Sequence, residues 1–164
     1  MGNNKKSYVI DECCIYHAAR LVNEKNEEDF TAIHMLTAIK NHCDKILVNR
    51  KLLQFYHKLI NKLQQQGNKS IFLLLKLIDD LIPNKSKFIF WETELYKLPN
   101  DEELPSDDVY LIRLAKITNS ILITSDLRLI EKINPNKDGY SQKYQIHVLT
   151  PQQVIKEISL DITN

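Results

Sequence analysis

The chain has 164 residues, of which 43% are hydrophobic and 26% charged, with a formal net charge of +1. This length suits one domain with a buried core, and it is short for two. The near balance of charge excludes a strongly basic module that binds nucleic acid through its net charge alone. A site for a polyanion must therefore come from local arrangement or from bound cations.

Cysteine usage points to a reducing compartment. The three cysteines, Cys13, Cys14 and Cys43, form no CxxC pair, which argues against a zinc site and for reduced thiols in the cytoplasm. The longest apolar run, residues 71–78, is broken by a lysine and is too short to cross a bilayer, so no membrane partner is expected. Residues 1–6 are predicted to form a flexible, solvated tail and residues 7–160 a single domain.

The first elements alternate between strand and helix. Ser7–Asp11 has the short apolar centre of a parallel strand that is buried on both faces. Helices are predicted over Glu12 to about Asn23 and over Glu28–His42, from apolar residues near helical spacing. Lys45–Val48 is predicted to be a second short strand.

Two long helices follow. The first is predicted over Arg50–Gln66, with Asn49 as its N-cap and Gly67 at its end. The second is predicted over Lys69–Ile82, and the proline that comes next stops it.

The centre of the chain is less regular. Lys87–Trp91 is apolar and fits either a strand or another buried segment. Pro99–Pro105 is predicted to be an acidic loop. A helix then begins at a cap formed by Ser106 or Asp107 and runs to about Asn119.

The last third supplies the final strands. Ile121–Thr124 is predicted to be a buried strand, Asn134–Ser141 a polar loop and Gln145–Leu149 the last strand. The dipeptide at 150–151, Thr-Pro, opens the last helix. Strands separated by helices of this length predict an α/β fold with a mostly parallel sheet.

Acidic residues stand where such a sheet binds its ligands. Asp11 closes the first strand, Asp126 follows the strand at 121–124, and Asp107 and Asp108 begin the helix that leads into that strand. Ligands of open parallel sheets bind outside the carboxyl ends of the strands. Clustered carboxylates repel each other, and Mg²⁺ or Mn²⁺ would neutralise them and activate water against a phosphate.

Each aspartate also fits a purely structural role. Asp11 could close a turn, Asp107 or Asp108 could cap a helix, and Asp126 could cap the segment Leu127–Ile133. The prediction of a metal site therefore rests on all of these acids reaching one edge of the sheet together.

Three stretches resemble PIN-domain nucleases. YVID at 8–11 is similar to the family's opening strand, DVYLIRLA at 108–115 with ILITSD at 121–126 to its most recognisable motif, and IHVLTPQQVI at 146–155 to its closing strand and helix. The resemblance implies a three-layer, Rossmann-like α/β/α sandwich, Mg²⁺ or Mn²⁺, and hydrolysis of phosphodiester bonds in RNA. It implies metal binding by Asp11, Asp126 and either Asp108 or Asp107.

The same resemblance implies supporting residues and partners. Thr124 and Ser125 would support the acids through hydrogen bonds. Many family members, such as the VapC group, are toxins of bacterial toxin–antitoxin pairs, so an antitoxin or other protein partner is expected besides RNA, and a homodimer is possible. The arginines expected to contact RNA phosphates are Arg128, Arg113 and Arg50.

One position departs from the family pattern. The family places a glutamate early in the helix after the second strand, where this chain has Gln54 or Phe55. Gln54 offers a neutral oxygen in its place, and Glu12 beside Asp11 offers a carboxylate. The departure leaves open a degenerate PIN domain that binds RNA or a protein partner without cutting. Three tyrosines on helices near the acids fit core packing better than base stacking: Tyr16, Tyr56 and Tyr110.

Overall fold

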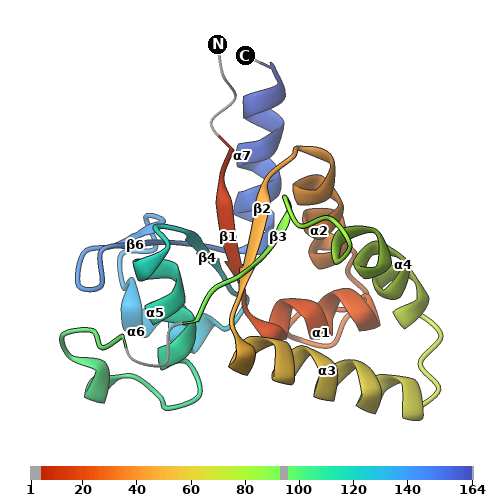
Figure 1. Ribbon diagram of the computed structural model, residues 1–164, viewed down its shortest axis with the longest axis horizontal. Coiled ribbons are helices and arrows are strands. Elements are labelled where there is room, and N and C mark those ends of the chain that lie inside the picture. The colour runs from red at the N-terminus through yellow and green to blue at the C-terminus, as the bar shows by residue number, and fades with distance from the viewer. Residues whose placement is uncertain (1–4, 93–95, 164) are drawn as a thin grey trace.

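The computed structural model describes residues 5–92 and 96–163 (Figure 1). One or two helices separate most successive strands along the described chain. Their bounds are β1 Ser7–Ile10, α1 Glu12–Arg20, α2 Thr31–Asn41, β2 Lys45–Val48, α3 Arg50–Gln65, α4 Ile71–Leu81, β3 Phe88–Phe90, the 3₁₀ turn η1 Asp101–Glu103, α5 Val109–Ile117, β4 Ile121–Ile123, α6 Leu127–Ile133, β5 Tyr140–Ser141, β6 Ile146–Leu149 and α7 Pro151–Thr163.

The sheet has the order β3-β2-β1-β4-β6-β5, and all neighbouring pairs except β5–β6 are parallel. From β1 the chain moves outward through β2 to β3, then returns to β4 on the other side of β1. This reversal between β1 and β4 is the topological switch point at which open α/β sheets bind ligands.

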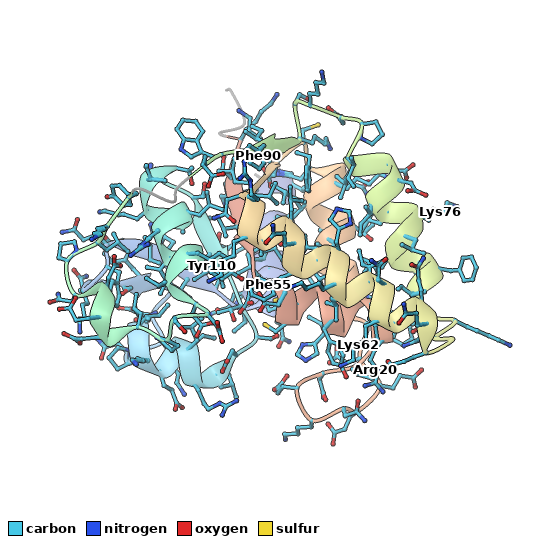
Figure 2. All side chains as sticks on the ribbon, turned by 60° about the horizontal axis from the view of Figure 1, so that its bottom comes forward. Arg20, Phe55, Lys62, Lys76, Phe90 and Tyr110 are labelled. Atoms are coloured by element: carbon cyan, nitrogen blue, oxygen red, sulfur yellow. The ribbon has the colours of Figure 1, made fainter. Side chains whose placement is uncertain are left out.

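Helices cover both faces of the sheet, which confirms the predicted three-layer α/β/α class. The helix α5 packs on β1, β4 and β6, whereas α7 packs on β6 and on α2, and α1 packs against α2, α3 and α4. Figure 1 shows α5 and α6 together on one side of the molecule, with α1 to α4 on the other. In Figure 2 the long helix α3 lies in front of α1.

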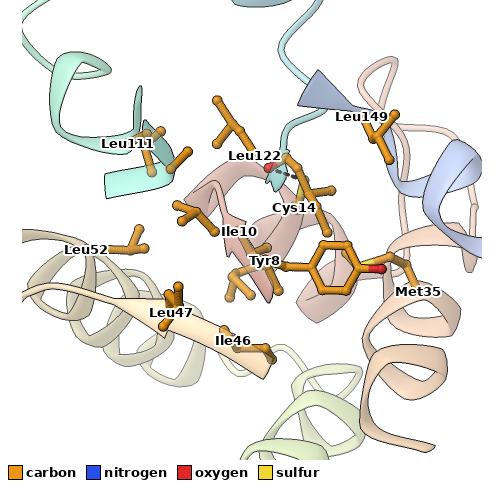
Figure 3. Close-up of a cluster of buried hydrophobic side chains, with 14 of the residues drawn as sticks. Tyr8, Ile10, Cys14, Met35, Ile46, Leu47, Leu52, Leu111, Leu122 and Leu149 are labelled. Carbon is orange, nitrogen blue, oxygen red and sulfur yellow. Dashed lines mark hydrogen bonds between the residues drawn. The ribbon is translucent and has the colours of Figure 1, made fainter. Parts of the chain in front are cut away.

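The core is centred on β1. Tyr8, Val9 and Ile10 are almost completely buried, because a central parallel strand is covered on both faces. Figure 3 shows Ile10 among side chains of β2, β4 and the neighbouring helices. The Cys14 thiol of α1 donates to the carbonyl of Ile123 at 3.8 Å, which ties α1 to β4 beside the switch point.

The structure settles one ambiguous segment of the sequence and shows that the loop predicted over Asn134–Ser141 is wrong at its end. Residues 88–90 form β3, which pairs with β2, so the segment Lys87–Trp91 contains a strand. Tyr140–Ser141, predicted to lie in a loop, pairs antiparallel with β6 instead.

Several helix starts and ends differ from the predictions by one to three residues, and three of these differences concern α1, α2 and α5. The helix α1 ends at Arg20 because Leu21 takes a left-handed conformation with φ 56°. The helix α2 starts at Thr31, later than predicted, because an isolated bridge between Val22 and Glu28 holds the preceding turn. The N-cap of α5 is Asp108, so the prediction of Ser106 or Asp107 as the cap is wrong.

The predicted tail is wrong at Lys6, and residues 1–4 lie outside the described residues. The backbone N–H of Lys6 donates to Oδ1 of Asp44 at 2.9 Å. Its ammonium pairs with Glu157 at 3.1 Å and with Asp161 at 3.0 Å, both on α7. Lys6 therefore belongs to the folded domain.

Candidate active site

Asp11 lies at the junction between β1 and α1. It is the N-cap of α1, and its carboxyl accepts from the N–H of Cys13 at 3.5 Å and from the hydroxyl of Thr124 at 2.6 Å. The side chain is buried, with the residue 4% exposed. Burial, opposed by the hydrogen bond from Thr124, raises the pKa of Asp11 to about 7.

Glu12 brings a second carboxyl to the same point. It follows Asp11 directly in the chain, and its Oε2 accepts from the hydroxyl of Tyr110 at 2.9 Å. Burial first, and then the charge of Asp11, raise the pKa of Glu12 to about 7. Because two buried, neighbouring carboxyls ionise together only at a cost, the pair retains a proton near neutral pH.

Asp126 is linked to Asp11 through Thr124. Its N–H donates to Oγ1 of Thr124 at 3.0 Å, and Thr124 in turn donates to Asp11. Thr124 therefore forms the hydrogen bonds to the acids that were expected of it. Asp126 also caps α6, with Oδ1 accepting from the N–H groups of Arg128 at 2.9 Å and Leu129 at 3.3 Å. Its Oδ2 accepts no hydrogen bond from any residue that the structure describes.

Of the two neighbouring aspartates at the start of α5, Asp108 joins Asp11, Glu12 and Asp126 in one group, which we call the acid cluster. It occupies the N-cap position, but its side chain makes no capping hydrogen bond. Burial first, and then the charges of Asp126 and Glu12, raise the pKa of Asp108. Asp107 is exposed to solvent. Four carboxyls, from Asp11, Glu12, Asp108 and Asp126, thus share one electrostatic environment at the switch point.

These acids do not form a ready-made coordination shell. Among residues 5–92 and 96–163, no group of three or more His, Cys, Asp or Glu side chains is placed so that it could hold a metal ion. The donor chemistry nevertheless suits a hard cation, since carboxylate oxygens are the ligands that Mg²⁺ and Mn²⁺ prefer. Burial is the main cause of the raised pKa values of Asp11, Glu12 and Asp108, and neighbouring carboxylates add to it at Glu12 and Asp108. A bound cation would stabilise the ionised form of all three side chains.

Gln54 does not take the place of the family's glutamate. It is exposed on α3, and no described hydrogen bond joins it to the acids. Its neighbour Phe55 points toward the site instead and stacks on Tyr110, with ring centroids 5.7 Å apart. Glu12 is therefore a better candidate than Gln54 for the fourth acidic residue of the site.

Ser125 supports a different pair of side chains. Its hydroxyl donates to the Cys13 thiol at 3.3 Å and lies 2.9 Å from Nδ1 of His17, and no described bond joins it to a carboxylate. Hydrogen bonding to Cys14, opposed by burial, lowers the pKa of Cys13 to about 6. Burial lowers the pKa of His17.

The sequence did not lead us to place Cys13 or His17 near the predicted site. The available signal was their four-residue spacing on the helix that follows Asp11, which puts both on one face. His17 and Ser125 also line a polar cavity of about 210 Å³, together with Thr31 and Thr150.

The three predicted arginines differ in availability. Both Nε and Nη2 of Arg113 bind Asp101, at 3.0 and 2.5 Å, and its side chain is 21% exposed. Arg113 is therefore removed from the candidate RNA contacts, because this ion pair occupies its guanidinium. Arg128 is 95% exposed, with its Nε 3.9 Å from Asp126, and Arg50 is exposed at the start of α3.

Comparison with known proteins leaves the family open. No family model matches the chain, and no curated protein matches its sequence. Among solved structures, the chain is similar to a domain of a functionally unknown protein from Methanocaldococcus jannaschii, at 19% identity and a TM-score of 0.48, covering 88% of this chain and 90% of that one. No helix within the described ranges has the length and apolar character needed to cross a membrane.

Proposed function

We propose that this protein is a metal-dependent ribonuclease of the PIN type. The observation that carries the proposal is the convergence of Asp11, Glu12, Asp108 and Asp126 at the β1–β4 switch point, with raised pKa values for the first three. Carboxyls held together against their own repulsion are typical of sites for divalent cations and phosphates. The PIN-like motifs around the same residues support RNA as the substrate.

The proposed division of labour follows from the contacts. Asp11, Glu12, Asp108 and Asp126 would hold Mg²⁺ or Mn²⁺, which when bound supplies charge neutralisation for the phosphate and lowers the pKa of water. Thr124 fixes the Asp11 carboxyl through its hydroxyl, and Tyr110 fixes Glu12. Arg128, exposed beside Asp126, is placed to meet a phosphate that enters the site.

The first test is isothermal titration of Mn²⁺ into the purified protein, followed by cleavage of a labelled single-stranded RNA with and without a chelator. Asp126→Asn and Asp108→Asn should abolish both the heat of Mn²⁺ binding and the cleavage of RNA. Asp107→Asn is the matched control, because it removes the same charge one residue away at an exposed position. Full cleavage by Asp108→Asn would remove Asp108 from the site, and absence of Mn²⁺ binding by the wild type would overturn the proposal.

A second candidate function is binding without catalysis, as in a degenerate PIN domain. It is favoured by Phe55 near the position of the family's glutamate and by the lack of a preformed coordination shell within the described parts of the chain. RNA binding that persists in a chelator, without cleavage after Mn²⁺ is added, would support this second function.

The setting of the reaction follows from the same proposal. We place it in the cytoplasm, where the described cysteines, all free thiols, would stay reduced. An antitoxin-like protein that covers the acids, or a second copy of the chain, would be the expected regulatory partner of a toxin-type ribonuclease.

A further inference from the structure

A shallow apolar groove runs beside the acids, between α1 and α3. It has a volume of about 390 Å³ and is lined by Glu12, Tyr16, Phe55, Lys58, Leu59 and Lys62, among others. Glu12 belongs at once to this α1–α3 groove and to the acid cluster. Anything that lies in the groove therefore lies next to the carboxyls.

One face of α3 carries the basic side chains of this surface. Lys51, Phe55, Lys58 and Lys62 recur at spacings of four, three and four residues along α3, which places them on one stripe of the helix. At the helical rise the stripe extends about 17 Å. Figure 2 shows Tyr110, Phe55, Lys62 and Arg20 one after another across the face formed with α1.

The positive charges of this face are not neutralised within the described structure. Lys58 and Lys62 are exposed and form no ion pair with any described residue, and α3 contains no acidic residue. The ammonium of Lys51 lies over the ring of Tyr110, 4.7 Å from its centroid, and hydrogen-bonds to the carbonyl of Ser106 at 3.2 Å. This leaves a cationic rim around an apolar floor.

The aromatic rings of the groove are partly open. Phe55 and Tyr16 are half-buried. Phe55 stacks on Tyr110 and has the ammonium of Lys51 5.9 Å from its centroid, so only the remaining part of its surface is open to a base. The guanidinium of Arg20 lies over the Tyr16 ring, 5.3 Å from its centroid, at the end of the groove away from the acids. Aromatic surface interleaved with unpaired lysines is the pattern that binds single-stranded nucleic acid, because bases stack on rings while cations meet the phosphates.

We propose that the α1–α3 groove is a binding site for single-stranded RNA. Bases pack against Phe55 and Tyr16, and Lys58 and Lys62 contact the phosphates on either side. The strand then continues past Glu12 to the acid cluster. A duplex fits poorly, because its base faces are stacked on each other and not available to the rings. Delivery of a phosphate to the acids rests on the proposed function, whereas binding in the groove does not require cleavage.

The test measures RNA binding apart from catalysis. Fluorescence anisotropy of a short, end-labelled oligouridine is followed in a chelator at fixed salt, since phosphate contacts make affinity salt-dependent. Phe55→Leu should weaken binding roughly five- to a hundredfold, the range for loss of one base–aromatic stack. Lys58→Glu with Lys62→Glu should weaken it at least as much. Both lysines are exposed, so this double variant keeps the fold if Phe55→Leu perturbs it.

Matched controls lie on α4, away from the groove. Phe72→Leu changes an aromatic side chain of a residue that is 73% exposed, and Lys76→Glu reverses an exposed lysine, marked in Figure 2. Both should leave affinity unchanged. Unchanged affinity in the groove variants, equal binding of a duplex of the same length, or equal binding of an acidic polypeptide such as polyglutamate would each overturn the proposal.

The design separates this inference from the proposed function. Asp126→Asn should bind the oligouridine at least as tightly as the wild type in the chelator, because it leaves the groove intact and removes a negative charge that repels RNA. Tight binding without cleavage in Mn²⁺ would support the groove and overturn the ribonuclease. Cleavage that is insensitive to Phe55→Leu and to the lysine variants would overturn the groove and leave the ribonuclease standing.

Discussion

The hydroxyl of Thr124 donates to the buried carboxyl of Asp11 at 2.6 Å, across the two central strands β1 and β4. Thr124 is itself fully buried, and the same hydroxyl accepts from the N–H of Asp126. One side chain thus fixes two of the four acids. The consequences can be tested residue by residue.

Replacing Thr124 with valine keeps the branched shape and removes the hydroxyl. Asp11 then loses a donor that favours its ionised form, so its pKa should rise further. The free energy of unfolding in urea at pH 8 should fall by about 1–3 kcal/mol, the range for a buried acceptor left without its donor. Thr124→Ser retains the donor and serves as control; equal pKa values of Asp11 in the valine and serine variants, measured by carboxyl-carbon NMR, would contradict the assignment.

The stability of the protein should respond to pH through Asp11 and Glu12. Both have a pKa of about 7 in the folded state, whereas such groups titrate near pH 4 in an unfolded chain. Between these limits the folded state binds more protons than the unfolded state, so their contribution to the free energy of unfolding falls as pH rises from about 4 to about 7. Above that window their contribution is constant.

Asp11→Asn isolates this effect from the other titrating groups. The stability of the variant relative to the wild type should increase steadily across the window, as followed by thermal unfolding. A difference between the two proteins that stays constant from pH 4 to pH 7 would show that Asp11 has an ordinary pKa.

Mn²⁺ should raise the melting temperature of the wild type more at pH 8 than at pH 5, because protons compete with the cation.

Glu12 should matter where Gln54 does not. Glu12→Gln is expected to lower the rate of Mn²⁺-dependent RNA cleavage roughly ten- to a hundredfold, the usual cost of disturbing a metal site. Gln54→Ala, at an exposed position on α3, should cleave at the wild-type rate. Cleavage rates that show the reverse order would return the family's glutamate position to Gln54.

The pH dependence of alkylation should show the lowered pKa of Cys13, which lies two residues after Asp11. Its pKa is lowered to about 6, so it is largely a thiolate at pH 7 and should react with iodoacetamide there. The modification rate, followed by mass spectrometry of the tryptic peptide, should fall as pH drops through 6. Ser125→Ala removes one hydrogen bond to the sulfur and should move the midpoint of this profile upward. A profile centred near pH 9 in the wild type would contradict the lowered pKa.

Much of the architecture was predictable because it depends on short apolar runs between helical segments. The runs at 7–11, 45–48, 121–124 and 145–149 all contain strands of the central sheet. The position of Asp11 and Asp126 at the carboxyl edge followed from those strands. The sequence alone could not decide between Asp107 and Asp108, because one residue at a helix start rotates the side chain by about 100°. That choice depends on where α5 begins.

Other parts of the site depend on contacts between distant segments. Adjacent residues point apart in a strand, yet Asp11 and Glu12 stand at a strand-to-helix junction, where both carboxyls reach the same end of α1. Arg113 is excluded as an RNA contact by its ion pair with Asp101, which lies in the short 3₁₀ turn η1. The hydrogen bond to the Cys13 thiol comes from Ser125, which follows β4 and lies 112 residues away along the chain.

The central position of β1 has a consequence for synthesis of the chain. Tyr8 pairs with Ile46 on one side and with Ile121 on the other, so β1 lacks its second neighbour until synthesis has passed β4. Asp11 and Glu12 emerge early, whereas Asp108 and Asp126 emerge late. The four acids therefore cannot meet on a nascent chain, and a product truncated before β4 would have neither the site nor a complete sheet.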